Sequence, residues 1–227
     1  MKLLAIDTSS DACSVAVQVG EDILEKHVIE PREHTKILVP MIEQLMQDAG
    51  VAMSGLDAVI LGNGPGSFIG MRIGASVAQG ICHGAGLQIV PVSSLAAIAA
   101  EAIAEHDAEK ILVAQDARMH EIYLGRFHAD AERLPAADDE EVICQIGPLT
   151  VPTGNYIAAG AGWLKYPELL AQNGNLFAAT EATADLVYPR ARHLLQLGGR
   201  SKLAGHGVPP GALVPAYIRS KVAEVPA

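Results

Sequence analysis

The sequence is poor in aromatic residues, cysteines and cations. Aromatic residues make up 4% of the 227 residues, so the core must be mostly aliphatic. The three cysteines lie far apart, form no CxxC pair and fit no Cys/His metal spacing, which suits a reducing compartment. The 16 Lys and Arg are outnumbered by 26 Asp and Glu. The resulting formal net charge of −10 disfavours tight binding of nucleic acid by the chain alone.

Long apolar runs and targeting signals are also missing. The first residues, MKLLAIDTSSD, start apolar but reach an acid at Asp7, which does not fit a secretory signal peptide. No apolar run approaches the roughly 20 residues that a membrane-spanning helix requires. Half of the residues are apolar, which is enough to bury a core. We therefore expect a cytoplasmic protein that does not bind a membrane.

The order of predicted elements in residues 1–105 indicates a mixed α/β sheet. Strands are predicted at 2–7, 13–19, 23–29, 56–61 and 88–92, and helices at 33–49, 71–83 and 93–105. Tight turns join the first three strands into an antiparallel meander, and the later strands alternate with helices. Pro40 predicts a kink or a break in the first helix. This order predicts an α/β fold of the actin-like (ASKHA, ribonuclease-H-like) type.

A second subdomain is predicted over residues 106–227, with the boundary near 104–110. Its predicted strands are 110–115, 121–127, 142–145 and 157–159, and its predicted helices are 164–172 and 190–203. Residues 130–141 hold six acids and one Arg and are expected to form an exposed loop. Whether the extreme carboxyl terminus packs back on the first subdomain is left open.

An acid followed by hydroxyls ends the first predicted strand. Asp7, Thr8 and Ser9 could orient a magnesium-bound water and hydrogen-bond a phosphate. The same residues also make an ordinary Asx turn. Both alternatives are kept, and these residues are weak candidates for a cofactor site.

The segment Gly62–Gly70 (GNGPGSFIG) places four glycines between a predicted buried strand and a predicted helix. Such a loop can present backbone N–H groups to an anion, which makes Gly64, Gly66 and Ser67 further weak candidates. It fits neither the Walker A nor the GxGxxG pattern. The alternative is a tight turn with Phe68 packed into a neighbouring element.

Motifs for independent catalysis are missing. The eight histidines show no HxxH, HxxxH or HExxH spacing, and the segment around Ser67 does not fit a GxSxG nucleophile elbow. The sequence therefore predicts no catalytic residue and no metal site.

Two predicted helices carry features of a protein interface. Helix 70–84 contains several small residues, and a glycine inside a helix costs about 1 kcal/mol relative to alanine, which indicates that another backbone packs close. Helix 33–49 has more apolar surface than one stripe requires. A bulky charge at Ala78 or Leu38 is expected to abolish pairing and to leave the monomer folded. The predicted interface residues are Leu38, Met41, Ile42, Leu45, Phe68, Met71, Gly74 and Ala78.

The carboxyl-terminal part has a local excess of positive charge. Between Leu186 and Val222 there is no Asp or Glu. The six cations could contact nucleic acid, or they could form an ordinary solvated face. They are Arg190, Arg192, Arg200, Lys202, Arg219 and Lys221.

An ordered set of motifs resembles a known family. The segments LLAIDTSSDACSVAV, EHTKILVPMI, DAVILGNGPGSFIGMRIG, PVSSLAAIA and QDARMHEIY together are similar to the bacterial TsaB (YeaZ) family. The match covers most of residues 1–125, and the ending PAYIRSK is also similar. Each motif alone is weak, but the set in this order is specific.

The resemblance implies a non-catalytic dimerization subunit with an actin-like fold. It would act with the catalytic subunit TsaD and the ATPase TsaE, which carry the ATP and the metal. That assembly transfers threonylcarbamoyl to N6 of adenosine 37 in tRNAs that read codons beginning with A. The resemblance also implies pairing with TsaD or with itself through helices 33–49 and 70–84, and tRNA contact only through the complex. TsaD relatives bind metal through a His pair on a helix, and the corresponding stretch here, 92–98, contains no histidine.

Two departures and two alternatives remain. Ile69 stands where the family usually has Thr (GPGSFTG), which weakens a phosphate role, and His120 follows the DAR segment at a position often held by a small or basic residue. One alternative is an M22-type metallopeptidase, which needs a metal site that the spacing does not provide. The other is a stand-alone actin-like ATPase, motivated by Asp7 and the glycine segment.

Overall fold

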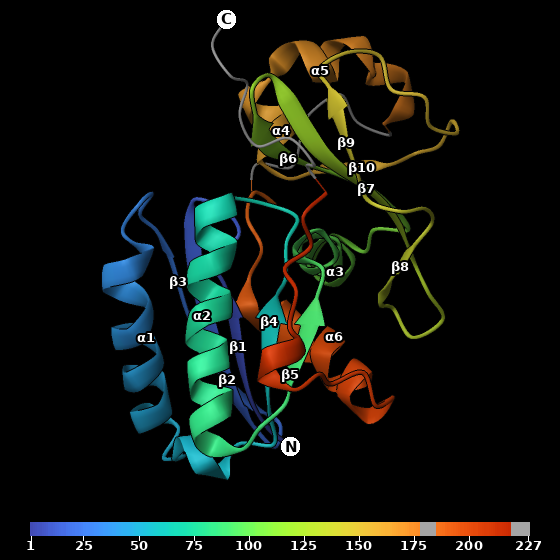
Figure 1. Ribbon diagram of the computed structural model, residues 1–227. Helices are drawn as coiled ribbons and strands as arrows, with labels where there is room; N and C mark the ends of the chain where they lie inside the picture. The colour runs from blue at the N-terminus through green and yellow to red at the C-terminus, as the bar shows by residue number, and fades with distance from the viewer. Residues whose placement is uncertain (178–184, 219–227) are drawn as a thin grey trace, which may run out of the picture.

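The computed structural model describes residues 1–177 and 185–218 as two lobes, each built on a five-stranded sheet (Figure 1). The first sheet has the order β3-β2-β1-β4-β5. Strands β1 to β3 pair antiparallel, whereas β1, β4 and β5 pair parallel. The predicted meander and the crossover to parallel strands are therefore confirmed. The strands are β1 (Lys2–Asp7), β2 (Ala12–Val19), β3 (Asp22–Ile29), β4 (Ala58–Gly62) and β5 (Ile89–Val92).

Helices cover both faces of the first sheet. Helices α1 (His34–Asp48) and α2 (Phe68–Ala85) pack on one face, and α6 (Ala191–Leu203) packs on the other. Successive side chains of β1 point to opposite faces of the sheet: Leu4 and Ile6 pack on the α1/α2 side, whereas Leu3 and Ala5 pack on the α6 side. This burial of aliphatic side chains on two faces explains the nearly continuous apolar runs of β1 and β4.

Helix α1 runs through Pro40 without a break, so the predicted break is wrong. A proline inside a helix costs about 3 kcal/mol and leaves the carbonyl four residues earlier without its bond. Pro40 and Lys36 are both exposed, so the Lys36 carbonyl lies on the solvent side of the helix. Leu38 and Met41 anchor the helix on the sheet at both sides of the proline.

The second sheet has the order β10-β6-β7-β8, and β9 also pairs with β7. Helix α3 (Ser94–His106) lies between the lobes: Leu95 and Ile98 pack on the second sheet, whereas Ala97 packs toward the first. Helices α4 (Ala161–Lys165) and α5 (Pro167–Gln172) cover the opposite face of the second sheet. The strands are β6 (Lys110–Arg118), β7 (Glu121–Ala129), β8 (Pro135–Ala137), β9 (Val142–Gln145) and β10 (Ile157–Ala159).

Several predicted boundaries shift for local reasons. Helix α2 begins at Phe68, three residues before the predicted start, because the Ser67 side chain accepts the Gly70 N–H and caps it. The predicted helix 164–172 is two short helices, and the second begins at Pro167. Strand β6 extends to Arg118, beyond the predicted strand 110–115, and the short strand β8 lies inside the predicted loop 130–141.

The chain returns to the first lobe at its carboxyl-terminal end. Dividing the chain at residue 105 assigns α6 to the second subdomain, but α6 packs on the first sheet. The 3₁₀ turn Pro210–Ala212 and Leu213 pack against the α1/α2 side of the same sheet. Residues 219–227, to which the prediction about the extreme terminus refers, lie outside the described residues. The two-lobed α/β architecture is the predicted actin-like fold.

Candidate functional site

Asp7 is fully buried at the end of β1. One carboxylate oxygen accepts hydrogen bonds from the Ser9 N–H and the Ser9 hydroxyl, both at 2.8 Å. The other accepts the Ser94 hydroxyl of α3 at 2.7 Å. Burial raises the pKa of Asp7, although the hydrogen bonds from Ser94 and Ser9 act in the opposite direction. Both oxygens are therefore used inside the chain, as in the Asx-turn alternative.

The glycine segment packs against the turn that follows Asp7. A Cβ atom at Gly62, Gly66 or Gly70 would lie less than 3.0 Å from Asp7, Ser9 or Thr8 respectively. At Gly66 and Gly70 the obstacle is a backbone carbonyl, which cannot move aside as a side chain can. These glycines therefore serve a close approach between two backbone segments.

Several amides of the glycine segment are hydrogen-bonded within the chain. The Ser67 N–H donates to the Ser9 carbonyl at 2.6 Å, and the Gly64 N–H donates to the Ser94 hydroxyl at 3.1 Å. The Thr8 hydroxyl donates to the Gly70 carbonyl at 2.7 Å. This pattern favours a tight strand-to-helix turn over an anion-binding loop.

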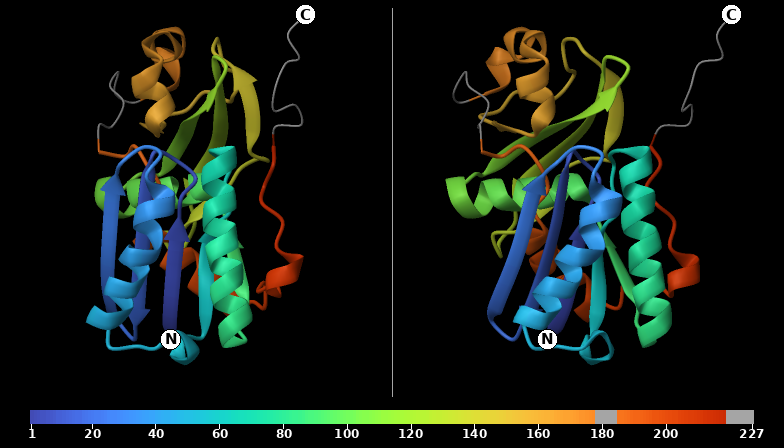
Figure 2. Two further views of the ribbon diagram at one scale, coloured as in Figure 1. Left: turned by 60° about the vertical axis from the view of Figure 1, so that its left-hand side comes forward. Right: turned by 90° about the vertical axis from the view of Figure 1, so that its left-hand side faces the viewer.

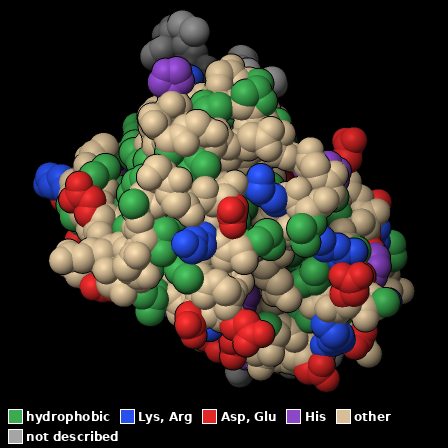
Figure 3. Space-filling model, turned by 90° about the horizontal axis from the view of Figure 1, so that it is seen from below, with side chains coloured by type: hydrophobic (Ala, Val, Ile, Leu, Met, Phe, Trp, Pro, Cys, Tyr) green, Lys and Arg blue, Asp and Glu red, His purple; other side chains and the backbone are tan. Residues whose placement is uncertain are grey.

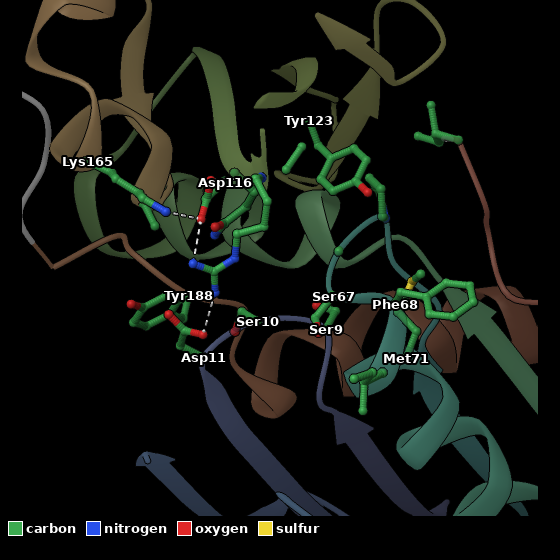
Figure 4. Close-up of a pocket in the computed structure, with 18 of the residues that line it drawn as sticks. Ser9, Ser10, Asp11, Ser67, Phe68, Met71, Asp116, Tyr123, Lys165 and Tyr188 are labelled. Carbon is green, nitrogen blue, oxygen red and sulfur yellow. Dashed lines mark hydrogen bonds and ion pairs between the residues drawn. The ribbon is translucent and has the colours of Figure 1, made fainter. Parts of the chain in front are cut away.

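A cleft of about 810 Å³ separates the two lobes above this turn (Figure 4). Ser9, Gly66 and Ser67 line the cleft, and Figure 4 shows Ser9 and Ser67 on the side of the first lobe. Asp7, Thr8 and Gly64 do not line it. One end carries Asp11, Asp116, Arg118 and Lys165, and the other end carries apolar side chains. The apolar end includes Phe68, Met71 and Tyr123.

Asp116 organises the charged end of the cleft. Its carboxylate accepts the Arg118 N–H at 2.9 Å and the Tyr166 hydroxyl at 2.8 Å, and it pairs with Lys165. Burial raises the pKa of Asp116, but the bonds from Lys165, Arg118 and Tyr166 outweigh burial and hold that pKa below its usual value. Arg118 also reaches Asp11 of the first lobe at 3.3 Å.

The charges at this end balance. Two acids and two cations are the charged side chains among the described residues that line the cleft. They pair with one another, so an anionic ligand such as a phosphate gains no net attraction from them. The stand-alone ATPase alternative is therefore not favoured.

The predicted interface residues lie mostly in the core. Seven of the eight are buried in the structure: Leu38, Met41, Ile42, Leu45, Met71, Gly74 and Ala78. Phe68 is partly exposed. The apolar stripe that marks an amphipathic helix points at its own core, so the prediction selected the inner face of each helix. Leu38 is 1% and Ala78 0% exposed, so a bulky charge at either would disrupt the fold rather than pairing alone.

The outer face of the helices holds a second, β-branched stripe that the prediction missed. Ile69 is 70% exposed in the first turn of α2, and Ile73 and Val77 follow at helical spacing. With Thr35 of α1 they line a groove of about 390 Å³ between the two helices. The spacing of 69, 73 and 77 was visible in the sequence and could have indicated this face.

Ion pairs occupy part of the predicted basic region. Arg190 contacts Glu25 at 2.6 Å and Glu101 at 3.8 Å, and Arg200 contacts Asp130 at 2.7 Å. Arg192 is exposed and Lys202 is partly exposed, whereas Arg219 and Lys221 lie outside the described residues. On the face in Figure 3, acidic and basic side chains are interspersed. The local excess of cations in the sequence is therefore reduced in space by acids from other elements.

His120 lies at the tip of the β6–β7 hairpin. Its ring packs edge-on against Tyr166, with 5.5 Å between ring centroids, and its Nε2 lies 3.8 Å from Glu168. Arg118, Met119 and His120 all have positive φ, which is costly for non-glycine residues. The contacts of His120 and Asp116 hold this tip in place.

The described residues contain neither a metal-binding cluster nor a helix that could span a membrane. Within 1–177 and 185–218, no group of three or more His, Cys, Asp or Glu side chains could hold a metal ion. In the same ranges no helix has the length and apolar character needed to span a bilayer. Stretch 92–98 supplies the Ser93 cap of α3 and the Ser94 hydroxyl that binds Asp7.

Comparisons with known proteins identify the family. The family model of TsaD, tRNA N6-adenosine threonylcarbamoyltransferase, matches residues 26–226. The tRNA threonylcarbamoyladenosine biosynthesis protein TsaB of Haemophilus influenzae is 32% identical over 98% of this chain and 95% of its own length. The chain belongs to the TsaB family. The Escherichia coli TsaB protein is 31% identical over 98% of this chain and 96% of its own length.

Solved structures agree with this TsaB-family assignment. YeaZ from Pseudomonas aeruginosa has a TM-score of 0.86 and 34% identity, covering 95% of this chain and 99% of that one. A second P. aeruginosa structure, of a protein described as similar to the peptidase YEAZ, has a TM-score of 0.87 and 35% identity, covering 96% of this chain and 99% of that one. The resemblance found in the sequence motifs is confirmed.

Proposed function

We propose that this TsaB-family chain is a non-catalytic scaffold subunit in the synthesis of threonylcarbamoyladenosine in tRNA. It would pair with a TsaD-type threonylcarbamoyltransferase and act with TsaE. The relatives from H. influenzae and E. coli are proteins of this biosynthesis, which supports the role. The partners would bring the ATP, the metal and the transfer of threonylcarbamoyl to N6 of adenosine 37, and tRNA would be held by the complex in the cytoplasm.

The outer faces of α1 and α2 are the proposed docking surface. The groove between them carries the proposal, because it combines the exposed Ile69 with the partly exposed Ile73 and Val77. Burying apolar surface contributes about 25 cal/mol per Å², less the cost of association. Ser76 and Gly80 are small and exposed on α2, so a partner helix can approach closely. The same surface would pair two copies of this chain when no TsaD is present.

The test is a bulky charge in the groove. Ser76 is exposed, so Ser76→Arg keeps the monomer folded while it blocks close approach. We expect at least about a tenfold rise in the Kd for TsaD, which corresponds to about 1.4 kcal/mol. Calorimetric titration of the purified chain with TsaD measures the Kd.

The matched control is Ala204→Arg, which adds the same charge to an exposed small residue after α6, on the opposite side of the sheet. It should leave the Kd unchanged. A Ser76→Arg variant that binds TsaD as tightly as the control would show that the α1/α2 groove is not the docking surface.

A further inference from the structure

The carboxyl-terminal strap, residues 208–218, forms a third element beside α1 and α2. It starts where Val208 and Ile89 exchange backbone hydrogen bonds of 2.8 and 2.9 Å at the edge strand β5. It then runs beside α2, where Gln79 donates to the Pro210 carbonyl at 2.9 Å and Leu213 is buried in the core. In both views of Figure 2 the strap follows α2 along its length on the side away from α1.

The end of the strap is fixed to the start of α2. Asn63 donates its side-chain amide to the Val214 carbonyl at 3.0 Å, and its own carbonyl accepts the Ala216 N–H at 3.1 Å. Arg72 donates Nε to the Tyr217 hydroxyl at 3.1 Å. The Arg72 guanidinium also lies 3.8 Å from the centre of the Phe68 ring, and the Phe68 and Tyr217 rings are 5.6 Å apart.

These contacts leave apolar side chains on the outside. Val214 is 72% exposed and Tyr217 is 43% exposed, although the Val214 carbonyl and the Ala216 N–H are hydrogen-bonded to Asn63 of the first lobe. Ile69, at 70% exposed, follows Phe68 on the same turn of α2 and lines the α1/α2 groove. Exposed apolar side chains therefore extend from the α1/α2 groove, past Phe68 and Arg72, to the strap.

The strap adds accessible area to the surface that the two helices form. Each partner in a stable complex of standard size buries about 800 Å² of accessible surface. The strap is the element next to α2 that is already held in place, through Gln79 and Asn63, so it can contribute to that area without rearrangement.

We infer that the strap is part of the surface that holds the TsaD-type partner, with Tyr217 and Val214 as contact residues. This inference rests on the proposed function and extends its docking surface to a third element. A Tyr, an Arg and a Phe in one preformed stack match the composition of interface residues that dominate binding energy. Because the strap is already ordered by Asn63, Arg72 and Leu213, docking on it costs little additional ordering.

The test removes the exposed side chains of the strap one at a time. Tyr217→Ser and Val214→Ser should each weaken binding to TsaD, by about tenfold for Tyr217→Ser if the ring is a dominant contact. Tyr217→Phe keeps the ring and its contact with Phe68, so its Kd should stay within about threefold of the parent chain. Leu203→Ser is the matched control, since Leu203 is 78% exposed on α6.

The outcomes separate the strap from the groove. If Ser76→Arg weakens binding while Tyr217→Ser and Val214→Ser bind like Leu203→Ser, the docking surface ends at α2 and this inference is overturned. If Ser76→Arg also binds TsaD as tightly as its control Ala204→Arg, the α1/α2 groove is not the docking surface, and the proposed function is left without one. Thermal unfolding of each variant checks that the lobe is intact, and Val214→Ser decides the question if Tyr217→Ser loosens the strap.

Discussion

At the scale of single residues, the most unusual group is the carboxylate of Glu101. It lies 6% exposed on α3, between the lobes, and its Oε2 has no hydrogen-bond partner. Arg190 is its nearest cation, and Arg190 is shared with Glu25. Burial raises the pKa of Glu101 to about 7, and the attraction of Arg190 offsets only part of this rise.

The raised pKa predicts a pH-dependent stability. Between pH 4.5 and about 7 the folded chain holds a proton on Glu101 that the unfolded chain releases. The contribution of Glu101 to stability is therefore complete below pH 4.5 and is lost as the pH rises to about 7. Glu101→Gln mimics the protonated form at every pH. We expect its free energy of unfolding, relative to the parent chain, to rise by roughly 2–3 kcal/mol between pH 4.5 and 8.

Urea unfolding at four pH values across this range measures the difference. Using the difference between two chains cancels other titrating groups such as His193, whose pKa burial lowers to about 4. Glu43→Gln, at an exposed position of α1, is the control and should show no pH trend. If the difference in free energy of unfolding between Glu101→Gln and the parent chain stays constant with pH, the raised pKa of Glu101 is contradicted.

At the scale of elements, the packing of the glycine segment on the β1–β2 turn makes a prediction about stability. Gly66→Ala forces a Cβ against the Ser9 backbone carbonyl, so the turn must shift. Overpacking of this kind costs about 1–3 kcal/mol. Chemical denaturation of the variant should show a loss in this range.

Gly80→Ala provides the contrast within the same part of the chain. No atom lies within 4 Å of a Cβ at Gly80, which is inside α2. Alanine there should stabilise the chain by up to about 1 kcal/mol through helix propensity. Equal changes in the free energy of unfolding for the two variants would mean that the contact with the Ser9 carbonyl does not require a glycine at position 66.

The elements also show what the sequence could and could not predict. Periodicity predicted every strand of the first sheet, because aliphatic runs such as Ala58–Gly62 are buried on both sides. The return of α6 to the first sheet was not predictable from periodicity, since an amphipathic stripe does not indicate which sheet or helix it will pack against. For the same reason the apolar face of α1 was assigned to a partner instead of to the chain's own core.

The candidate site divides in the same way. Local signals in the sequence raised the choice between an Asx turn and a ligand site at Asp7. Contacts between distant segments favour the Asx turn, because Ser94 reaches Asp7 across 87 positions of sequence and occupies its second carboxylate oxygen. The pairing of Arg200 with Asp130 likewise joins two segments whose charges look separate in the sequence.

At the scale of the whole molecule, this chain carries out no bond-making step under the proposed function. Incubated alone with tRNA and the threonylcarbamoyl adenylate, the purified chain should leave adenosine 37 unmodified, because the proposed function assigns the transfer step to TsaD. Adding TsaD and TsaE should restore modification. Mass spectrometry of nucleosides from digested tRNA measures both results. Turnover by the isolated chain would refute the scaffold role.

The position of α6 has a consequence for how the protein is made. The face of the first sheet formed by Leu3, Ala5 and Ile60 is covered by Leu194 and Leu195, which follow the whole second lobe in the sequence. During synthesis the first lobe therefore keeps this side of its sheet bare while the second lobe is being made. Native closure of the first lobe must wait for residues that the ribosome adds after the second lobe.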